Sequence, residues 1–133
     1  MKGKIVHIEI PADDTQRAMK FWGDVTGWKF KNYGEGQEGM PEYNMFEGEP
    51  GGGLYPAREG EKGIKVYFEV DDIDAEIEGI RKAGGTIDEK MPVPSMGWFA
   101  EGTDTEGNKF SVWQSDESAP VPEGMGAQSA SSN

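Results

Sequence analysis

The residues best suited to chemistry stand close together near the start of the chain. His7 is the only histidine in the sequence, and Glu9 follows it two positions later. Lys4–Ile10 alternates in polarity, which predicts a strand whose His7 and Glu9 side chains share one face. If the chain is an enzyme, these two are its candidate acid–base groups. They could also bind a metal, but catalytic metal sites usually take about three protein ligands. The simpler interpretation is an imidazole in a pocket at the start of a sheet.

A glycine-rich motif lies further along the chain, Gly34-x-Gly36-x-x-Gly39. Its letters match the dinucleotide-binding pattern, but that pattern works only between a strand and the N-terminus of a helix. Here Pro41 and a strand-like segment follow instead. We therefore interpret the stretch as a mobile loop rather than a nucleotide site.

The elements that must position these residues occur twice. The offset that lays His7 on Lys65 also lays Gly53 on Ser111. Each copy contains an alternating strand, an Asp-Asp pair that can cap a helix, an amphipathic helix and further strands. Neither copy is long enough to bury a core alone. The repeat therefore predicts one pseudo-symmetric domain made of two strand–helix–strands modules.

We expect this domain to span residues 1–115, with modules 1–57 and 64–115 joined by the polar linker Ala57–Gly63. Residues 116–133 lack apolar periodicity and are expected to form a disordered tail. Met91–Pro94 should be an extended loop, because two prolines would remove donors from a strand ladder. Further strands are expected at 4–10, 28–33, 43–47, 51–55, 64–70, 98–102 and 109–114, with a turn at 104–108. The first helix should begin at Asp13 or Asp14 and end at Gly27. The second should begin at Asp71 or Asp72 and end at 83–85.

Parity along the strands separates an apolar face from a polar and aromatic one. Ile8 and Ile10 alternate with His7 and Glu9, so the apolar face should pack against the helices. A sheet face that mixes aromatic and charged side chains more often lines a ligand groove than a core. The residues that we expect on the ligand-binding face are His7, Glu9, Trp28, Tyr43, Lys65, Tyr67, Glu69, Trp98, Ser111 and Trp113.

Composition excludes several classes of partner. The formal net charge of −12 offers no basic footprint for nucleic acid. No segment approaches the roughly 18 apolar residues of a membrane span. The sequence has no cysteine, which rules out disulfides and thiolate chemistry and fits a cytoplasmic protein.

Four segments together resemble a known family: Val6–Asp14, Phe21–Trp28, Phe68–Ile73 and Asp104–Gln114. They are similar to the vicinal oxygen chelate superfamily of glyoxalases, bleomycin-resistance proteins and extradiol dioxygenases, and the resemblance covers residues 4–114. It implies an α+β fold in which two βαβββ modules form a curled mixed sheet, or cup, often completed by a homodimer.

The resemblance also implies where a metal would be held. Metalloenzymes of the superfamily place one ligand early in the first and last strands of each module, and these positions correspond here to His7, Gly53, Lys65 and Ser111. Gly53 thereby joins the expected ligand-binding residues. Only His7 is a good ligand, because glycine has no side chain, lysine is cationic and serine is a weak neutral donor. We therefore expect no metal and no cofactor.

The function predicted is that of a small-molecule-binding protein, similar to the drug-sequestering members of the superfamily. Aromatic side chains would stack on a planar ligand, and Glu9 and Glu69 could attract a cationic group. One alternative is a lyase, isomerase or dioxygenase with non-standard metal ligands or none. Another is an accessory module that keeps the fold for protein–protein contact.

Overall fold

The computed structural model describes residues 3–32 and 41–121. These residues form two compact units. The first comprises the described part of residues 5–66, and the second comprises residues 67–121 with residues 3 and 4. Neither helix in the described residues is long and apolar enough to cross a membrane.

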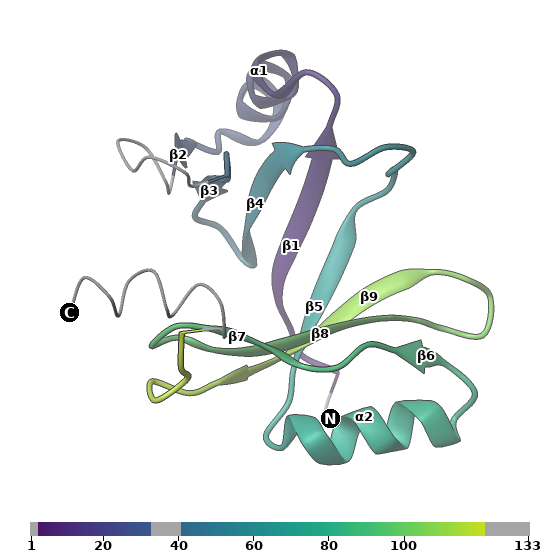
Figure 1. Ribbon diagram of the computed structural model, residues 1–133. Coiled ribbons are helices and arrows are strands. Elements are labelled where there is room, and N and C mark those ends of the chain that lie inside the picture. The colour runs from purple at the N-terminus through teal and green to yellow at the C-terminus, as the bar shows by residue number, and fades with distance from the viewer. Residues whose placement is uncertain (1–2, 33–40, 122–133) are drawn as a thin grey trace. The chain divides into compact units, whose positions relative to one another are not determined.

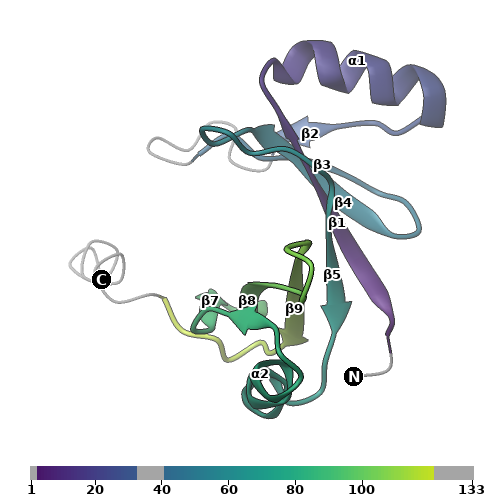
Figure 2. The ribbon, with the colours of Figure 1, turned by 90° about the vertical axis from the view of Figure 1, so that its right-hand side faces the viewer.

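The first unit is a four-stranded mixed sheet with one helix (Figure 1). Its strands lie in the order β2-β3-β4-β1, with β1 and β4 parallel and the other pairs antiparallel. Helix α1 lies along one side of this sheet (Figure 2). The elements are β1 (Ile5–Ala12), α1 (Thr15–Thr26), β2 (Lys31–Asn32), β3 (Asn44–Phe46) and β4 (Gly51–Pro56).

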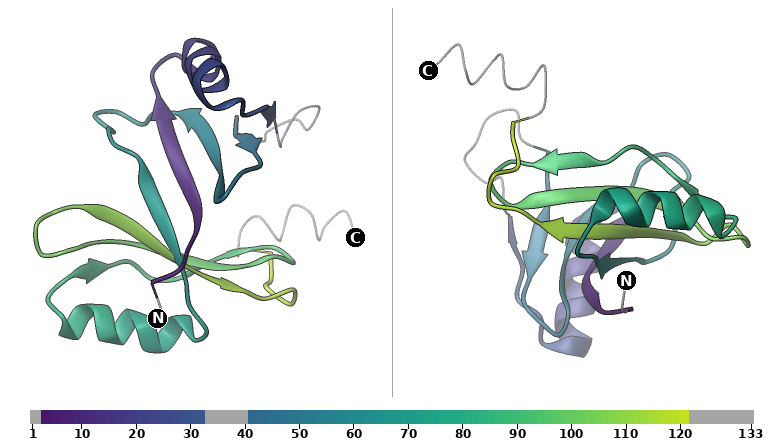
Figure 3. Two further views of the ribbon diagram at one scale, coloured as in Figure 1. Left: turned by 180° about the vertical axis from the view of Figure 1, so that it is seen from behind. Right: turned by 90° about the horizontal axis from the view of Figure 1, so that it is seen from below.

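The second unit repeats this plan. Strand β5 contains the boundary between the units and is followed along the chain by α2, which runs along the sheet of β8 and β9 (Figure 3). Strand β8 pairs with β9 on one edge and with β6 and β7 on the other, always antiparallel. The elements are β5 (Lys65–Glu69), α2 (Ile73–Lys82), β6 (Thr86–Ile87), β7 (Met91–Val93), β8 (Gly97–Thr103) and β9 (Lys109–Ser115).

The predicted α+β fold with two βαβββ modules is confirmed. Corresponding helices begin in the same way, because the carboxylates of Asp14 and Asp72 each accept a hydrogen bond from the backbone N–H three residues later. Gly27 ends α1 in the left-handed conformation, with φ of 83°. In the second module the left-handed residue is Gly84, with φ of 99°, one position before the residue that the offset pairs with Gly27.

The apolar parity predicted for the strands is also observed. In the first unit Ile8 and Ile10 pack with Leu54, Phe46 and the inner face of α1. In the second, the residues that pack with α2 are Phe68, Val70, Ala100, Phe110 and Val112. Each unit therefore has its own core between its helix and one face of its sheet.

Two predicted elements differ from the structure. The strand expected at 28–33 is reduced to Lys31–Asn32, because the Trp28 N–H is held by the Thr26 hydroxyl and the Trp28 ring turns into the core. Position 33 and the glycine motif lie outside the described residues. Met91–Val93 is a strand, not a loop: among the described residues it pairs with β8 alone, and an edge strand tolerates the missing donor of Pro92.

The chain also continues in ordered contact past residue 115, where we expected a disordered tail to begin. Asp116 and Ala119 are joined by backbone hydrogen bonds to Met96 and Ser95, at 2.8 and 3.0 Å. The Trp98 indole donates to the Asp116 carboxylate at 3.1 Å, and Ala119 is buried. These contacts attach residues 116–119 to the turn between β7 and β8.

A chain that ends at Ser115 should therefore melt at a lower temperature than one that ends at Val121. The shorter chain loses three hydrogen bonds, each worth about 0.5–1.5 kcal/mol, and the burial of Ala119. We expect a fall of roughly 5 °C or more by differential scanning calorimetry. Equal melting temperatures for the two truncated chains would show that residues 116–121 do not stabilise the fold.

Candidate functional site

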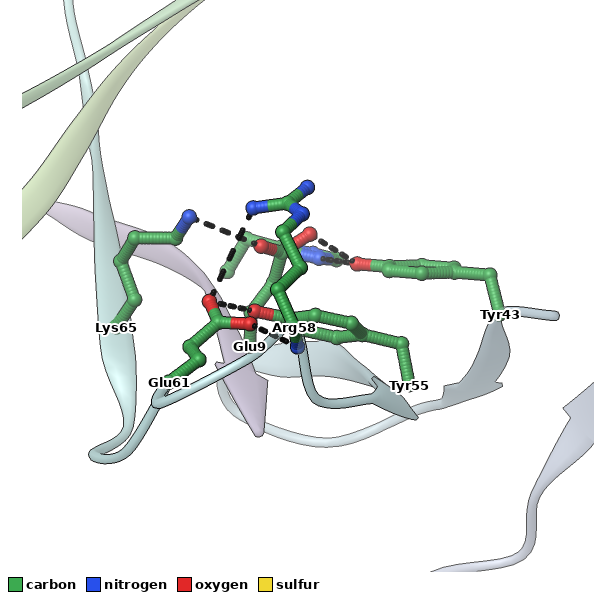
Figure 4. Close-up of polar contacts among 7 residues, drawn as sticks. Glu9, Tyr43, Tyr55, Arg58, Glu61 and Lys65 are labelled. Carbon is green, nitrogen blue, oxygen red and sulfur yellow. Dashed lines mark hydrogen bonds and ion pairs between the residues drawn. The ribbon is translucent and has the colours of Figure 1, made fainter. Parts of the chain in front are cut away.

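The polar side chains of the first unit gather on the sheet face opposite α1. Strand β1 supplies His7 and Glu9 there, and their neighbours Ile8 and Ile10 point to the helix side. The other members come from the segment before β3, from β4, from the loop that follows β4 and from the start of β5 (Figure 4). We call this group the polar cluster; its members are His7, Glu9, Tyr43, Tyr55, Arg58, Glu61 and Lys65.

Tyr43 is the centre of the polar cluster. Its hydroxyl oxygen lies 2.7 Å from Nε2 of His7 and 2.8 Å from Oε2 of Glu9. The hydroxyl donates its single proton to Glu9, so the contact with His7 requires that Nε2 carries a proton and donates to the tyrosine oxygen. The geometry therefore assigns one tautomer to His7, with the proton on Nε2 and the lone pair on Nδ1.

The Tyr43 ring occupies the space left by the missing side chain of Gly53. Strand pairing sets Gly53 between Glu9 on β1 and Met45 on β3. A Cβ atom at position 53 would overlap the Cζ, hydroxyl and Cε2 atoms of the Tyr43 ring. Only glycine leaves room for the ring at this register, which explains why a strand residue here has no side chain.

The backbone on either side of Tyr43 is held as well. Glu42 accepts hydrogen bonds from the Thr15 hydroxyl and from the Asn44 amide, both at 2.8 Å. The buried Asn44 amide also donates to the Leu54 carbonyl at 3.1 Å. These bonds tie the Tyr43 segment to α1 and β4, so the hydroxyl has a defined position.

An ion pair completes this part of the polar cluster. Lys65 Nζ lies 3.5 Å from Oε1 of Glu9, and the two side chains are 8% and 15% exposed. Burial lowers the pKa of the His7 imidazole, and the Glu9 carboxylate opposes that shift only in part. At neutral pH the His7 imidazole is therefore uncharged, and Lys65 balances the charge of the neighbouring Glu9 carboxylate.

A second group of the polar cluster is formed by Tyr55, Glu61 and Arg58. The Tyr55 hydroxyl donates to Glu61 at 2.5 Å, and the Arg58 guanidinium lies 3.9 Å from the same carboxylate. Two main causes raise the pKa of Tyr55 far above its ordinary value: burial is the larger, and the hydrogen bond to Glu61 is the second. Burial works against ionisation of Glu61 as well, but hydrogen bonds from Tyr55 and from the Arg58 N–H lower its pKa overall. Tyr55 thus remains a neutral donor to an ionised carboxylate.

The aromatic rings of the polar cluster are nearly parallel. The His7 and Tyr43 ring planes differ by 10°, with centroids 6.4 Å apart. Tyr43 and Tyr55 differ by 22° at 6.2 Å. The cluster therefore combines flat ring surfaces with hydrogen-bonding groups whose charges are balanced in pairs.

Five of the predicted residues come together in this unit: His7, Glu9, Tyr43, Gly53 and Lys65. The prediction that Trp28 lies on the ligand-binding face is wrong. Its ring stacks on that of Phe46 in the core on the helix side, with the ring centroids 3.9 Å apart. Sequence reasoning missed Tyr55, although it shares strand parity with Gly53. It also missed Arg58 and Glu61, because their segment has the composition of a linker.

The predicted residues of the second unit fall on two faces. Ser111 and Trp113 alternate with the core residues Phe110 and Val112, as parity predicted. The same prediction is wrong for Trp98, which packs against the core beside α2 and donates a hydrogen bond from its indole to Asp116. Tyr67 is buried, and Glu69 lies 3.7 Å from Lys4. The buried hydroxyl of Ser111 has no hydrogen-bond partner among the described residues.

Three of the four positions at which the resemblance implies metal ligands, all in the first unit, do not suit a metal. The Tyr43 ring fills the space at Gly53, Lys65 brings a positive charge, and the His7 nitrogen that faces the centre carries a proton. In the described part of the chain, no three or more histidine, aspartate and glutamate side chains are grouped so that they could hold an ion. The donor set therefore does not fit the group that the family implies.

Comparison with known proteins gives consistent matches. Residues 4–112 match the family model of the Glyoxalase/Bleomycin resistance protein/Dioxygenase superfamily. A glyoxylase-like domain-containing protein of Didymella fabae is 36% identical over 126 residues, which cover 84% of this chain and 94% of that protein.

Solved structures share the fold at low identity. A hypothetical protein from Bacillus halodurans C-125 aligns with a TM-score of 0.67 and 18% identity, over 91% of this chain and all of that one. Methylmalonyl-CoA epimerase from Mycobacterium tuberculosis aligns with a TM-score of 0.61 and 14% identity, over 90% and 89% of the two chains. At these identities the likeness concerns the fold alone.

The packing of Tyr43 on Gly53 predicts that Gly53→Ala is destabilising. The added methyl group must displace the Tyr43 ring, and overpacking of this kind typically costs about 1–3 kcal/mol. Gly79→Ala is the matched control, because Gly79 lies in α2 with open space around its Cβ position. Urea unfolding should show a loss for the first variant and none for the second; equal stabilities would contradict the packing.

Proposed function

The chain belongs to the Glyoxalase/Bleomycin resistance protein/Dioxygenase superfamily, and within it we propose that the protein binds a small planar molecule at the polar cluster without a metal ion. One observation carries the proposal: the Tyr43 hydroxyl is held between His7 and Glu9 above Gly53. Hydrogen-bonding groups in fixed positions beside flat rings are the usual features of a small-molecule site.

The ring geometry favours a planar ligand. The nearly parallel rings of His7, Tyr43 and Tyr55 offer surfaces of one orientation. Aromatic pairs gain about 0.5–1.5 kcal/mol beyond the burial of their area. A flat ligand that continues this arrangement would gain the same kind of contact.

The charges favour an uncharged ligand over the cationic one that composition suggested. Glu9 lies beside Lys65, Glu61 beside Arg58, and in the second unit Glu69 beside Lys4. A cationic ligand would have to compete with a lysine or arginine at each carboxylate. A neutral molecule with a hydrogen-bonding group needs no such exchange.

Catalysis without a metal is the second candidate function. The hydrogen-bonded series of His7, Tyr43 and Glu9 contains a base and a carboxylate in contact through one hydroxyl, an arrangement that can move protons. A lyase or isomerase would use His7 or Glu9 as its acid–base group. An accessory module without a ligand is the third candidate, and it predicts that the polar cluster binds no small molecule.

Binding can be tested with three probes that share one ring: indole-3-acetamide, tryptamine and indole-3-acetate. We expect the neutral amide to shift the imidazole NMR signals of His7, the only histidine in the sequence, and to bind no more weakly than either charged probe. Tyr43→Ala should weaken binding about tenfold, or about 1.4 kcal/mol. Phe21→Ala, on the exposed side of α1, is the control and should have no effect. Failure of all three probes to bind would contradict the proposal, and tightest binding of tryptamine would restore the cationic alternative.

We also propose that the protein is a cytoplasmic homodimer, as the absence of cysteine and the family resemblance suggest. Multi-angle light scattering at micromolar concentration should give about twice the 14.6 kDa mass of one chain. A monomer mass under these conditions would exclude the dimer.

A further inference from the structure

The position of Tyr43 has a consequence for metal binding. By the family resemblance, His7 and Gly53 occupy places where metalloenzymes of the superfamily hold their ion. In this chain the Tyr43 ring fills the volume that a side chain at position 53 would need. The Tyr43 hydroxyl then contacts His7, the one residue of the implied set that could ligate well.

The hydrogen-bond directions differ from those of a metal site. A metal ion accepts lone pairs from an imidazole nitrogen and from a carboxylate alike. The Tyr43 hydroxyl accepts a hydrogen bond from His7 Nε2 and donates one to Glu9 Oε2. His7 therefore presents an N–H, not a lone pair, to the centre of the cluster.

The positive charge of Lys65 also disfavours a metal ion at the Tyr43 hydroxyl. The Lys65 ammonium group lies 3.5 Å from Glu9 and is 8% exposed. A divalent cation at the Tyr43 hydroxyl would be close to this positive charge in surroundings that screen it poorly. It would also have to displace the ion pair before it could use the carboxylate.

From these three observations we infer that the Tyr43 hydroxyl replaces the metal ion as the polar centre of the site, and that Tyr43 and Gly53 form one pair that excludes metals and selects the ligand. The selection follows from hydrogen-bonding capacity, since a hydroxyl that already accepts from His7 and donates to Glu9 cannot chelate a ligand as a metal ion does. The ligand class is thus a planar molecule that presents one polar group to the cluster, rather than a vicinal diol or hydroxy acid. This statement about ligands rests on the proposed function; the exclusion of metals does not.

Titration with Co²⁺, followed by its visible absorbance, tests the exclusion. The native protein and Tyr43→Phe, which keeps the ring, should show no stoichiometric binding. The double variant Tyr43→Ala with Gly53→His removes the ring and adds an imidazole to His7 and Glu9, so it should bind one Co²⁺ per chain at least about tenfold more tightly. Adding His7→Ala to the double variant should abolish this binding.

A double-mutant cycle tests the pairing without any metal. Gly53→Ala should lower the melting temperature of the native protein by roughly 5 °C and leave that of Tyr43→Ala unchanged, because the obstructing ring is gone. Equal effects in the two backgrounds would overturn the inference. So would stoichiometric Co²⁺ binding by the native protein that is lost in His7→Ala, or a folded double variant that binds no Co²⁺.

Failure of this inference can be distinguished from failure of the proposed function. If indole-3-acetamide binds but the cycle shows no coupling, the site binds ligands and Tyr43 is not the replacement. If the cycle and the Co²⁺ titration behave as expected but no indole probe binds, the metal is excluded and the proposed planar ligand is wrong.

Discussion

The site depends on the contact between the Tyr43 ring and the backbone at Gly53. Strands β1, β3 and β4 pair so that position 53 faces the space between Glu9 and the segment that carries Tyr43. Because glycine leaves that space open, the ring can reach across the sheet and place its hydroxyl against two residues of β1. Any side chain at this position would push the ring away and break the contacts of its hydroxyl with His7 and Glu9.

Charge is organised locally in a way that the net charge does not indicate. The chain carries a formal charge of −12, yet each carboxylate of the polar cluster has a basic side chain within 4.0 Å. Pairing reduces the cost of burying Glu9 and Lys65, since an isolated buried ion loses its hydration without compensation. Burial, not this pairing, lowers the pKa of His7, although the Glu9 carboxylate favours the imidazolium form.

The repeat and the strand parity were sufficient to predict the modules, the helix caps and the sheet faces that carry His7 and Trp113. Both signals are local, with fixed periods, so they survive without knowledge of tertiary contacts. The side chains of Trp28 and Trp98 were misplaced because an aromatic residue suits a groove and a core equally well. The Tyr43–Gly53 contact joins the segment before β3 to strand β4, and no pattern along the sequence indicates it. Glu61, the partner of Tyr55, was missed because its segment after β4 has the composition of a linker.

The most direct test of this account is the tautomer of His7, measured by long-range ¹H–¹⁵N NMR of the imidazole at neutral pH. The single histidine makes the spectrum unambiguous. If the Tyr43 hydroxyl donates to Glu9 and accepts from His7, the ring must be protonated at Nε2, and Tyr43→Phe must remove that constraint. A ring protonated at Nδ1 in the native protein would contradict the central role of the hydroxyl.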